Sequence, residues 1–162
     1  MNILLSCIGR RGYIAEYFRE ALQPGDRIIG TSNSILTAGF EACDLGVILP
    51  DIQSPDYIPA FVQLCREQNI DAIFSLYDPD IHILASHSDE LKKAGISRVL
   101  PSFEVSDICF DKIRTDTFLG EHGLARPTLF KTLDSSLHTI ETNVAELPMI
   151  VKPRYGFGSI NL

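Results

Sequence analysis

The sequence predicts an α/β fold, in which helices cover both faces of a doubly wound parallel sheet, followed by the incomplete start of an α+β unit. Short, nearly continuous apolar runs suit parallel strands that are buried on both faces. Segments with a single apolar stripe at helical spacing alternate with these runs. The alternation stops near residue 106, which predicts where the second unit begins.

Five apolar runs are predicted as strands, and they span residues 2–7, 27–31, 45–49, 72–76 and 98–100. Three intervening segments are predicted as helices, and they span residues 13–22, 57–68 and 81–94. The last of them begins after Asp78-Pro79 and ends at Gly95, which are typical start and stop signals. Repeated β-α units of this kind predict one domain over residues 1–106.

The pattern changes over residues 107–162, which are predicted as a second unit. Helices are predicted over residues 108–122 and 144–147, and strands over residues 128–131 and 148–152. The final Ile160-Asn161-Leu162 is typical of an opening strand, so we expect the chain to stop inside this unit. A length of 162 residues suits one domain and part of another.

The charge balance excludes several classes of partner. A net charge of −7 and a pI near 5.0 provide no general basic field for nucleic acid or an anionic membrane, so a small anion requires a local site. No secretory leader or long apolar run is present, which predicts a cytoplasmic protein. The four cysteines form no C-x-x-C pair and are expected to be reduced and buried.

The segment that follows the predicted strand 148–152 indicates a phosphate site. The strand ends at Lys152, a positioned point charge, and Arg154 offers a planar fork to phosphate oxygens. Gly156 and Gly158 let backbone N–H groups approach a phosphate, and Ser159 adds a hydroxyl donor. Lysine before glycine is not the order of a P-loop. The alternative is a β-hairpin turn beside a surface lysine and arginine.

A second lysine follows Asp111 at the start of a helix. Lys112 lies in a first helical turn, where the helix dipole slightly disfavours a cation, and this hints at another use for the side chain. The alternative for Lys112 is an ordinary solvated helix residue.

Polar residues also follow two strands of the first unit. Gly9, Arg10 and Arg11 stand between the first strand and its helix, where open α/β sheets hold ligands, and the arginines could pair with a carboxylate or phosphate. Asp78 and Asp80 follow the fourth strand and could orient an amine or a metal. The alternatives are a solvated turn for the first group, and for the second an N-cap at Asp78 with Asp80 in the first helical turn.

The spacing of glycines and histidines argues against a dinucleotide site and a zinc site. Gly9 and Gly12 do not make G-x-G-x-x-G, and the second strand ends in Thr31-Ser32-Asn33 without the acid that binds a ribose, so a dinucleotide site is not expected. The four histidines lack i,i+3 or i,i+4 spacing and have no nearby cysteine ligand, so zinc is not expected either.

The motifs together resemble the ATP-grasp superfamily. The resemblance is carried by Asp111-Lys112, by Gly123-Leu124-Ala125-Arg126-Pro127-Thr128, by residues 147–154 and by the loop 156–159. In particular, the chain is similar to the carbamoyl-phosphate synthase large subunit and related carboxylate-amine ligases, whose leading domain often begins with a strand and a G-R-R turn. The resemblance covers essentially the whole chain, with specific motifs only in its last third.

The resemblance implies a Rossmann-like pre-ATP-grasp domain over residues 1–106 and a truncated first part of the ATP-grasp domain over residues 107–162. It implies that Lys112 and Lys152 contact ATP, and that Arg154 and the loop from Gly156 through Gly158 to Ser159 cover its β- and γ-phosphates. In the family the leading domain helps to hold the other substrate, which would be the role of Gly9, Arg10, Arg11, Asp78 and Asp80. The two Mg²⁺ ions are held by residues beyond this chain, so no metal site is expected within it.

The function that the resemblance implies for the longer parent is ATP-dependent ligation. A carboxylate, or bicarbonate, is activated as an acyl phosphate and then attacked by an amine or ammonia. The 162-residue chain by itself is expected to be inactive, and a homodimer is one assembly open to the protein. The alternative is a non-catalytic module that binds a ligand or partner and keeps a remnant of the nucleotide site. The sequence does not specify the acid or the amine.

Overall fold

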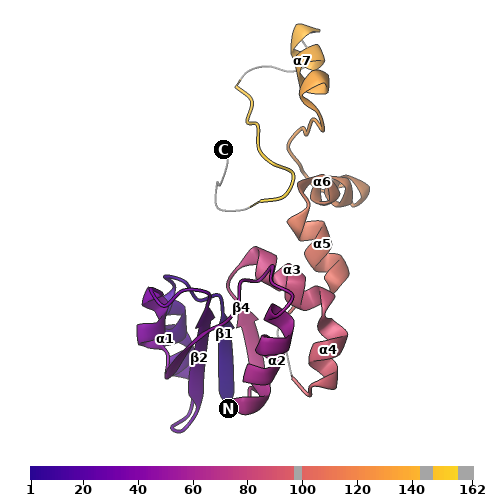
Figure 1. Ribbon diagram of the computed structural model, residues 1–162. Coiled ribbons are helices and arrows are strands. Elements are labelled where there is room, and N and C mark those ends of the chain that lie inside the picture. Colours follow the sequence, from indigo (N-terminus) through magenta and orange to yellow (C-terminus); the bar gives the residue numbers. More distant parts are fainter. Residues whose placement is uncertain (97–99, 143–147, 157–162) are drawn as a thin grey trace. The chain divides into compact units, whose positions relative to one another are not determined.

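The computed structural model describes residues 1–96, 100–142 and 148–156, and the chain divides into two compact units, Met1–Ser106 and Asp107–Leu162. In the described part of the first unit, a four-stranded sheet has the order β3-β2-β1-β4, and every pairing is parallel (Figure 1). The strands are β1 (Asn2–Ser6), β2 (Arg27–Ser32), β3 (Leu45–Ile48) and β4 (Ala72–Ser75). The predicted α/β fold with a parallel sheet is confirmed.

Helices cover both faces of this sheet, and β1 shows why. Leu4 points into the core on one face, while Ile3 and Leu5 point into the core on the other. Each fully buried aliphatic side chain of this kind contributes about 1.5–3 kcal/mol. The first core is closed by α2 (Tyr57–Glu67), α3 (Asp78–Ser86) and α4 (Ser88–Lys93), and the second by α1 (Gly12–Ala21) and the 3₁₀ helix η1 (Ala38–Ala42) (Figure 1).

The helix predicted over residues 81–94 is two helices, α3 and α4, which meet at His87. The Ser86 hydroxyl and the His87 ring both approach the Ile83 carbonyl oxygen, at 2.7 and 3.0 Å, where side chains compete with the helical ladder. The predicted strand 98–100 lies largely outside the described residues. Among the cysteines, Cys65 is buried but Cys109 is exposed, so the expected burial is wrong for Cys109.

The second unit is built from helices and extended chain. Its boundary with the first unit falls within α5 (Phe103–Phe110), and α6 (Lys112–Glu121) and α7 (Leu133–Glu141) follow. The helix predicted over residues 108–122 therefore breaks at Asp111, whose side chain caps α6 by accepting from the Ile113 N–H at 2.9 Å. The helix α7 was not predicted from sequence, although Thr132 and Ser135 form a capping box at its start.

The two strands predicted in the second unit are not formed in the described residues. Residues 128–131 and 148–152 pair with no strand there, so these assignments are wrong. A strand needs a hydrogen-bonding partner, and an apolar pattern by itself does not supply one. Ile150 and Val151 are accordingly 80% and 79% exposed. The helix predicted over residues 144–147 lies outside the described residues.

None of the helices in the described ranges has the length and apolar character needed to cross a membrane.

Two leucine-to-alanine substitutions in the first unit are expected to differ clearly in their effect on the free energy of unfolding. Leu84→Ala is expected to lower the free energy of unfolding by about 2–5 kcal/mol, because Leu84 is fully buried and its removal leaves a cavity. Leu36 is 91% exposed, so Leu36→Ala is expected to change the same quantity by less than about 0.5 kcal/mol. Urea unfolding followed by circular dichroism measures both, and equal effects would contradict the packing of α3 against the sheet.

Candidate functional site

In the second unit, the extended segment 148–156 returns beside the start of α6 (Figure 1). Arg154 meets Asp111 there, 43 residues earlier in the chain. Its Nε lies 2.9 Å from both carboxylate oxygens of Asp111, and its Nη2 donates to Oδ2 at 2.5 Å. This two-pronged contact is the strongest type of arginine–carboxylate pair.

The Asp111 carboxylate is the acceptor at the centre of this cluster. Besides Arg154, it accepts from the Ile113 N–H and from the Tyr155 hydroxyl, the latter at 3.3 Å. The Asp111 side chain is 2% exposed and that of Arg154 is 48% exposed, so the pair lies at the boundary with solvent. The hydrogen bonds from Arg154 lower the pKa of Asp111 from 3.8 to about 2.

Lys112 holds the main chain of the same segment. Its Nζ donates to the carbonyl oxygens of Arg154 at 3.2 Å and of Gly156 at 3.0 Å, and its backbone N–H donates to the Arg154 carbonyl at 3.3 Å. An ammonium group has three N–H donors, so one remains beyond these two carbonyl contacts. Asp111 thus binds the side chain of Arg154, and Lys112 binds its backbone carbonyl.

The other residues predicted to bind nucleotide are Lys152, Gly156, Gly158 and Ser159, and the structure describes the first two. Lys152 is exposed, and no hydrogen bond or ion pair joins it to the described residues. Gly156 has φ of +140°, a conformation that favours glycine, and a Cβ there would lie 3.4 Å from the Pro153 ring. Gly158 and Ser159 lie outside the described residues. The structure therefore brings Lys112, Arg154 and Gly156 together, with Lys152 just upstream.

In the first unit, the loop after β1 turns tightly against η1. Gly9 has φ of +53° and its carbonyl oxygen accepts from the Gly39 N–H at 2.8 Å. A Cβ on Gly39 would lie only 2.8 Å from that oxygen, so the close approach requires glycine at residue 39. Arg10 and Arg11 are exposed on this turn. The β1–α1 turn is therefore a fixed platform that presents two arginines to solvent.

Asp78 and Asp80 have different surroundings although they are close in sequence. Asp78 is exposed at the first position of α3 and the N-cap is Tyr77, so the alternative in which Asp78 caps the helix is wrong by one residue, whereas Asp80 does lie in the first helical turn. Asp80 is fully buried and accepts from the Tyr57 hydroxyl at 2.5 Å and the Ser75 hydroxyl at 2.6 Å. Asp80 thus belongs to a polar network beneath the sheet edge.

That network was not predicted from sequence. The Tyr57 hydroxyl also lies 3.3 Å from the Ser6 hydroxyl, and the Thr31 hydroxyl donates to Ser6 at 3.4 Å. Ser6 and Ser75 are register partners at the ends of β1 and β4, where the strand order reverses. The available signal was a hydroxyl residue at the end of each of these strands.

Burial and the Asp80 charge act on the ionisable neighbours of this network. Burial, and then the nearby Asp80 carboxylate, raise the pKa of the Cys7 thiol to about 12. The same two causes raise the pKa of the Tyr57 hydroxyl. Both groups are therefore neutral at physiological pH, and Cys7 is not an activated nucleophile.

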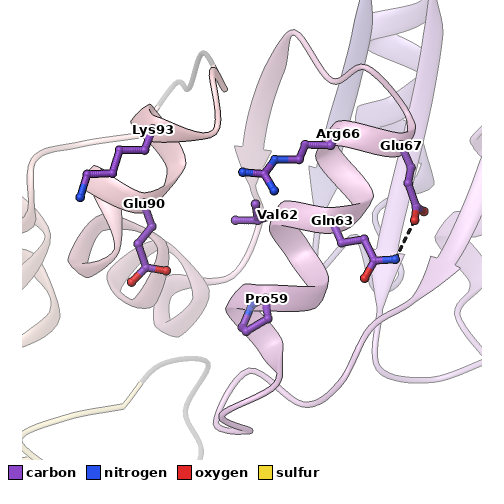
Figure 2. A pocket seen from close by; sticks show the side chains of 7 residues that line it. All are labelled: Pro59, Val62, Gln63, Arg66, Glu67, Glu90 and Lys93. Atoms are coloured by element: carbon purple, nitrogen blue, oxygen red, sulfur yellow. Dashed lines mark hydrogen bonds between the residues drawn. The ribbon is translucent and has the colours of Figure 1, made fainter.

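A separate groove lies between α2 and α4, with a volume of about 710 Å³. Figure 2 shows its lining: Glu90 and Lys93 come from α4, and Arg66, Gln63 and Glu67 come from α2, where Gln63 is hydrogen-bonded to Glu67. Charges of both signs line it, and it contains none of the predicted site residues. We assign no ligand to this groove.

No group of three or more His, Cys, Asp or Glu side chains that could hold a metal ion occurs in the part of the chain that the structure describes.

The first unit, with its parallel sheet in the order β3-β2-β1-β4, has the fold of the N-terminal domain of ATP-grasp enzymes. Residues 3–99 match the family described as PylC-like, N-terminal domain. Because this match covers more than half of the chain, the chain belongs to the PylC-like family through that domain. The predicted resemblance to the ATP-grasp superfamily is confirmed. No curated protein matches the chain.

Three solved structures illustrate the likeness. An N5-carboxyaminoimidazole synthetase from Staphylococcus aureus, complexed with ADP, is 13% identical, with a TM-score of 0.69 over 99% of this chain and 40% of that one. An L-amino acid ligase from Bacillus licheniformis is 21% identical, with a TM-score of 0.64 over 96% of this chain and 37% of that one.

The third structure is the biotin carboxylase domain dimer of the Hydrogenobacter thermophilus 2-oxoglutarate carboxylase, in complex with MgADP, ADP and bicarbonate. It is 15% identical, with a TM-score of 0.60 over 90% of this chain and 33% of that one. At these identities the likeness shows the fold, and the chain spans well under half of each of the three proteins.

The low pKa of Asp111 predicts how the local stability of the second unit depends on pH. The folded-state pKa of about 2 lies below the ordinary value of 3.8, so the unfolded chain binds the proton first as the pH falls. The stabilisation is fully present above about pH 4 and is lost as the pH falls towards 2. After correction for intrinsic exchange, the Ile113 amide is expected to lose hydrogen-exchange protection over this range.

Two variants control for this interpretation. Asp111→Asn removes the titrating carboxyl and keeps a good N-cap, so its Ile113 protection is expected to lack this acid-dependent loss. Asp116→Asn alters a carboxylate that pairs with Arg126 instead, and it is expected to keep the wild-type profile. A profile shared by all three proteins would show that Asp111 is not the responsible group.

Proposed function

We propose that the chain is the amino-terminal part of an ATP-grasp ligase that activates a carboxylate or bicarbonate as an acyl phosphate for attack by an amine or ammonia. The observation that carries this proposal is the contact of Lys112 with the backbone of Arg154 and Gly156. It unites two motifs of the predicted nucleotide site that are more than 40 residues apart in the sequence. A solvated surface lysine, the alternative for Lys112, would not require that contact.

The cluster has the chemistry that a triphosphate needs. Lys112 keeps an N–H donor beyond its two carbonyl contacts, and Lys152 is an exposed cation just before the turn. The Nη1 side of Arg154 is not used by Asp111. Lys112 and Arg154 lie together here with Lys152 two residues upstream of Arg154, so these cations outnumber the Asp111 carboxylate in a chain whose net charge is −7. ATP therefore fits the described residues, with Gly158 and Ser159 proposed as further contacts.

For the second substrate, we propose the edge of the sheet after β1 and β4. Arg10 and Arg11 are exposed on a rigid turn and can pair with a carboxylate or bicarbonate. Exposed Asp78 is available to an amine, whereas Asp80 has hydroxyl donors on both of its oxygens. A direct substrate contact by Asp80 therefore requires a rearrangement, and its more immediate role is to hold Tyr57 and Ser75.

The remaining parts of the function are proposed from the family. Mg²⁺ accompanies the nucleotide in the proposed reaction and neutralises phosphate charge, but we assign it no ligand among the described residues. Carbamoyl-phosphate synthase-like chemistry is the specific form of the ligase that the motifs favour. A homodimer and a cytoplasmic location stay predictions.

The nucleotide proposal predicts a loss of affinity when either lysine is removed. Lys112→Ala and Lys152→Ala are each expected to weaken Mg·ATP binding by about 1.5–3 kcal/mol, because each deletes a charge-assisted contact. Calorimetry on the complete gene product measures this change. Lys131 is an exposed lysine of the same unit, so Lys131→Ala serves as the control and should leave the affinity unchanged. Unchanged affinity in both lysine variants would favour the hairpin-turn alternative.

The substrate proposal predicts a separation of kinetic effects. After a screen of carboxylate and amine pairs for ATP-dependent phosphate release, Arg10→Ala and Arg11→Ala are expected to raise KM for the carboxylate by about tenfold or more. KM for ATP should change little, because the turn contributes nothing to the proposed nucleotide site. Arg66→Ala, in the groove of Figure 2, is the matched control. If only KM for ATP rises, the β1–α1 turn does not hold the carboxylate.

A further inference from the structure

Asp111 has more partners than helix capping requires. An N-cap side chain satisfies one or two N–H groups of its own helix. Asp111 does this through Ile113, and in addition its two oxygens receive three contacts from Arg154 and one from Tyr155. A carboxylate that is 2% exposed thus links the start of α6 to a segment more than 40 residues later.

We infer that Asp111 is a positioning residue of the nucleotide site, which orients the Arg154 guanidinium and holds its segment against Lys112. The inference rests on the proposed function, because it concerns how the cations of that site are arranged. Asp111 itself does not contact the phosphates in this assignment, since a carboxylate and a phosphate repel each other.

The geometry of Arg154 supports this role. Its Nε and Nη2 both face the Asp111 carboxylate, so rotation of the guanidinium plane is restricted and the Nη1 edge is left for another ligand. The guanidinium carbon also lies 5.2 Å from the centre of the Tyr155 ring. A flexible arginine would lose conformational entropy on binding a phosphate, whereas a held arginine has lost most of it beforehand.

The backbone contacts of Lys112 complete the arrangement. The Arg154 carbonyl accepts from both the backbone N–H and the Nζ of Lys112, while the side chain of Arg154 is bound by the residue before it. Loss of the Asp111 carboxylate would therefore release Arg154 and loosen the surroundings of Lys112 together. A single substitution is expected to affect two cations.

For Asp111→Asn, the electrostatic effect and the positioning effect change the affinity for Mg·ATP in opposite directions. The substitution removes a negative charge from the phosphate site, which by itself would strengthen the binding of an anion. It also weakens the hold on Arg154, which would reduce affinity. Asparagine is nearly the size of aspartate and is an equally good N-cap, so the start of α6 is retained.

The experiment measures Mg·ATP affinity of the complete gene product by calorimetry. Asp111→Asn is expected to weaken binding about tenfold, in the range of a lost charged hydrogen bond. Asp116→Asn removes a carboxylate from the same helix, where it pairs with Arg126, and should leave the affinity within about twofold of wild type. In an Arg154→Ala background, Asp111→Asn should not weaken binding further, because the residue to be positioned is absent and only the loss of a negative charge, which favours an anion, remains.

A second measurement needs no variant of Asp111. The Arg154 Nε–H resonance in wild-type protein is expected to keep its hydrogen-bonded chemical shift when Mg·ATP is added to saturation. Loss of that shift would mean that Arg154 leaves Asp111 to bind nucleotide, and this would overturn the positioning role.

Failure of this inference is distinguishable from failure of the proposed function. If Lys112→Ala weakens Mg·ATP binding but Asp111→Asn leaves it equal or tighter, Asp111 is a bystander and the nucleotide site stands. If neither Lys112→Ala nor Lys152→Ala changes the affinity, the nucleotide site itself is wrong and the role of Asp111 is overturned with it.

Discussion

The strand β1 is hydrogen-bonded on both edges and packed on both faces, and the first unit depends on that position. β2 and β4 flank it in parallel, so the ends of all three strands come to one edge of the sheet. Leu4 is completely enclosed on one side, and Ile3 and Leu5 are enclosed on the other. Because hydrogen bonds on both edges and packing on both faces oppose a shift in register, the turn that follows β1 is held at a fixed place.

The polar groups at this sheet edge are consequences of the same packing. Ser6 and Ser75 end adjacent strands at one level, and Asp80 lies where hydroxyl donors reach both of its oxygens. A buried carboxylate without such donors would be strongly unfavourable. The network therefore stabilises the ends of β1 and β4, while Arg10 and Arg11 are exposed on the turn that follows β1.

The second unit is organised in the opposite way. Neither α6 nor α7 has a buried residue, and its long-range order comes from polar contacts centred on Asp111. Asp80 and Asp111 are both buried carboxylates, but their partners differ. Neutral hydroxyls surround Asp80, and burial together with the Asp80 charge raises the pKa of Cys7 and of Tyr57. The Arg154 guanidinium instead compensates the Asp111 carboxylate and lowers the pKa of that carboxyl. The first carboxylate suits a structural role, and the second suits a charged binding site.

Periodicity in the sequence was sufficient for the first unit. Residues 2–7, 27–31, 45–49 and 72–76 were predicted as strands and became β1 to β4 within one or two residues. The runs in β1 and β2 are buried on both faces, as expected for inner parallel strands. In β3, at the end of the strand order, burial alternates and Ile48 is 51% exposed. The breaks at His87 and Asp111 were not predicted, since both depend on side chains that bind local backbone groups. The strand predicted over residues 128–131 failed because pairing is a property of two segments.

For the candidate site, the local pattern indicated which residues carry cations, and the folded chain decided how they are arranged. Lys152, Arg154 and Gly156 are close in the sequence, so their chemistry could be inferred from order and spacing. Local order does not reveal that Asp111 binds Arg154 or that Lys112 binds two carbonyl oxygens of the same segment. Those contacts join positions more than 40 residues apart, and only the path of the chain between them brings a buried carboxylate to the arginine.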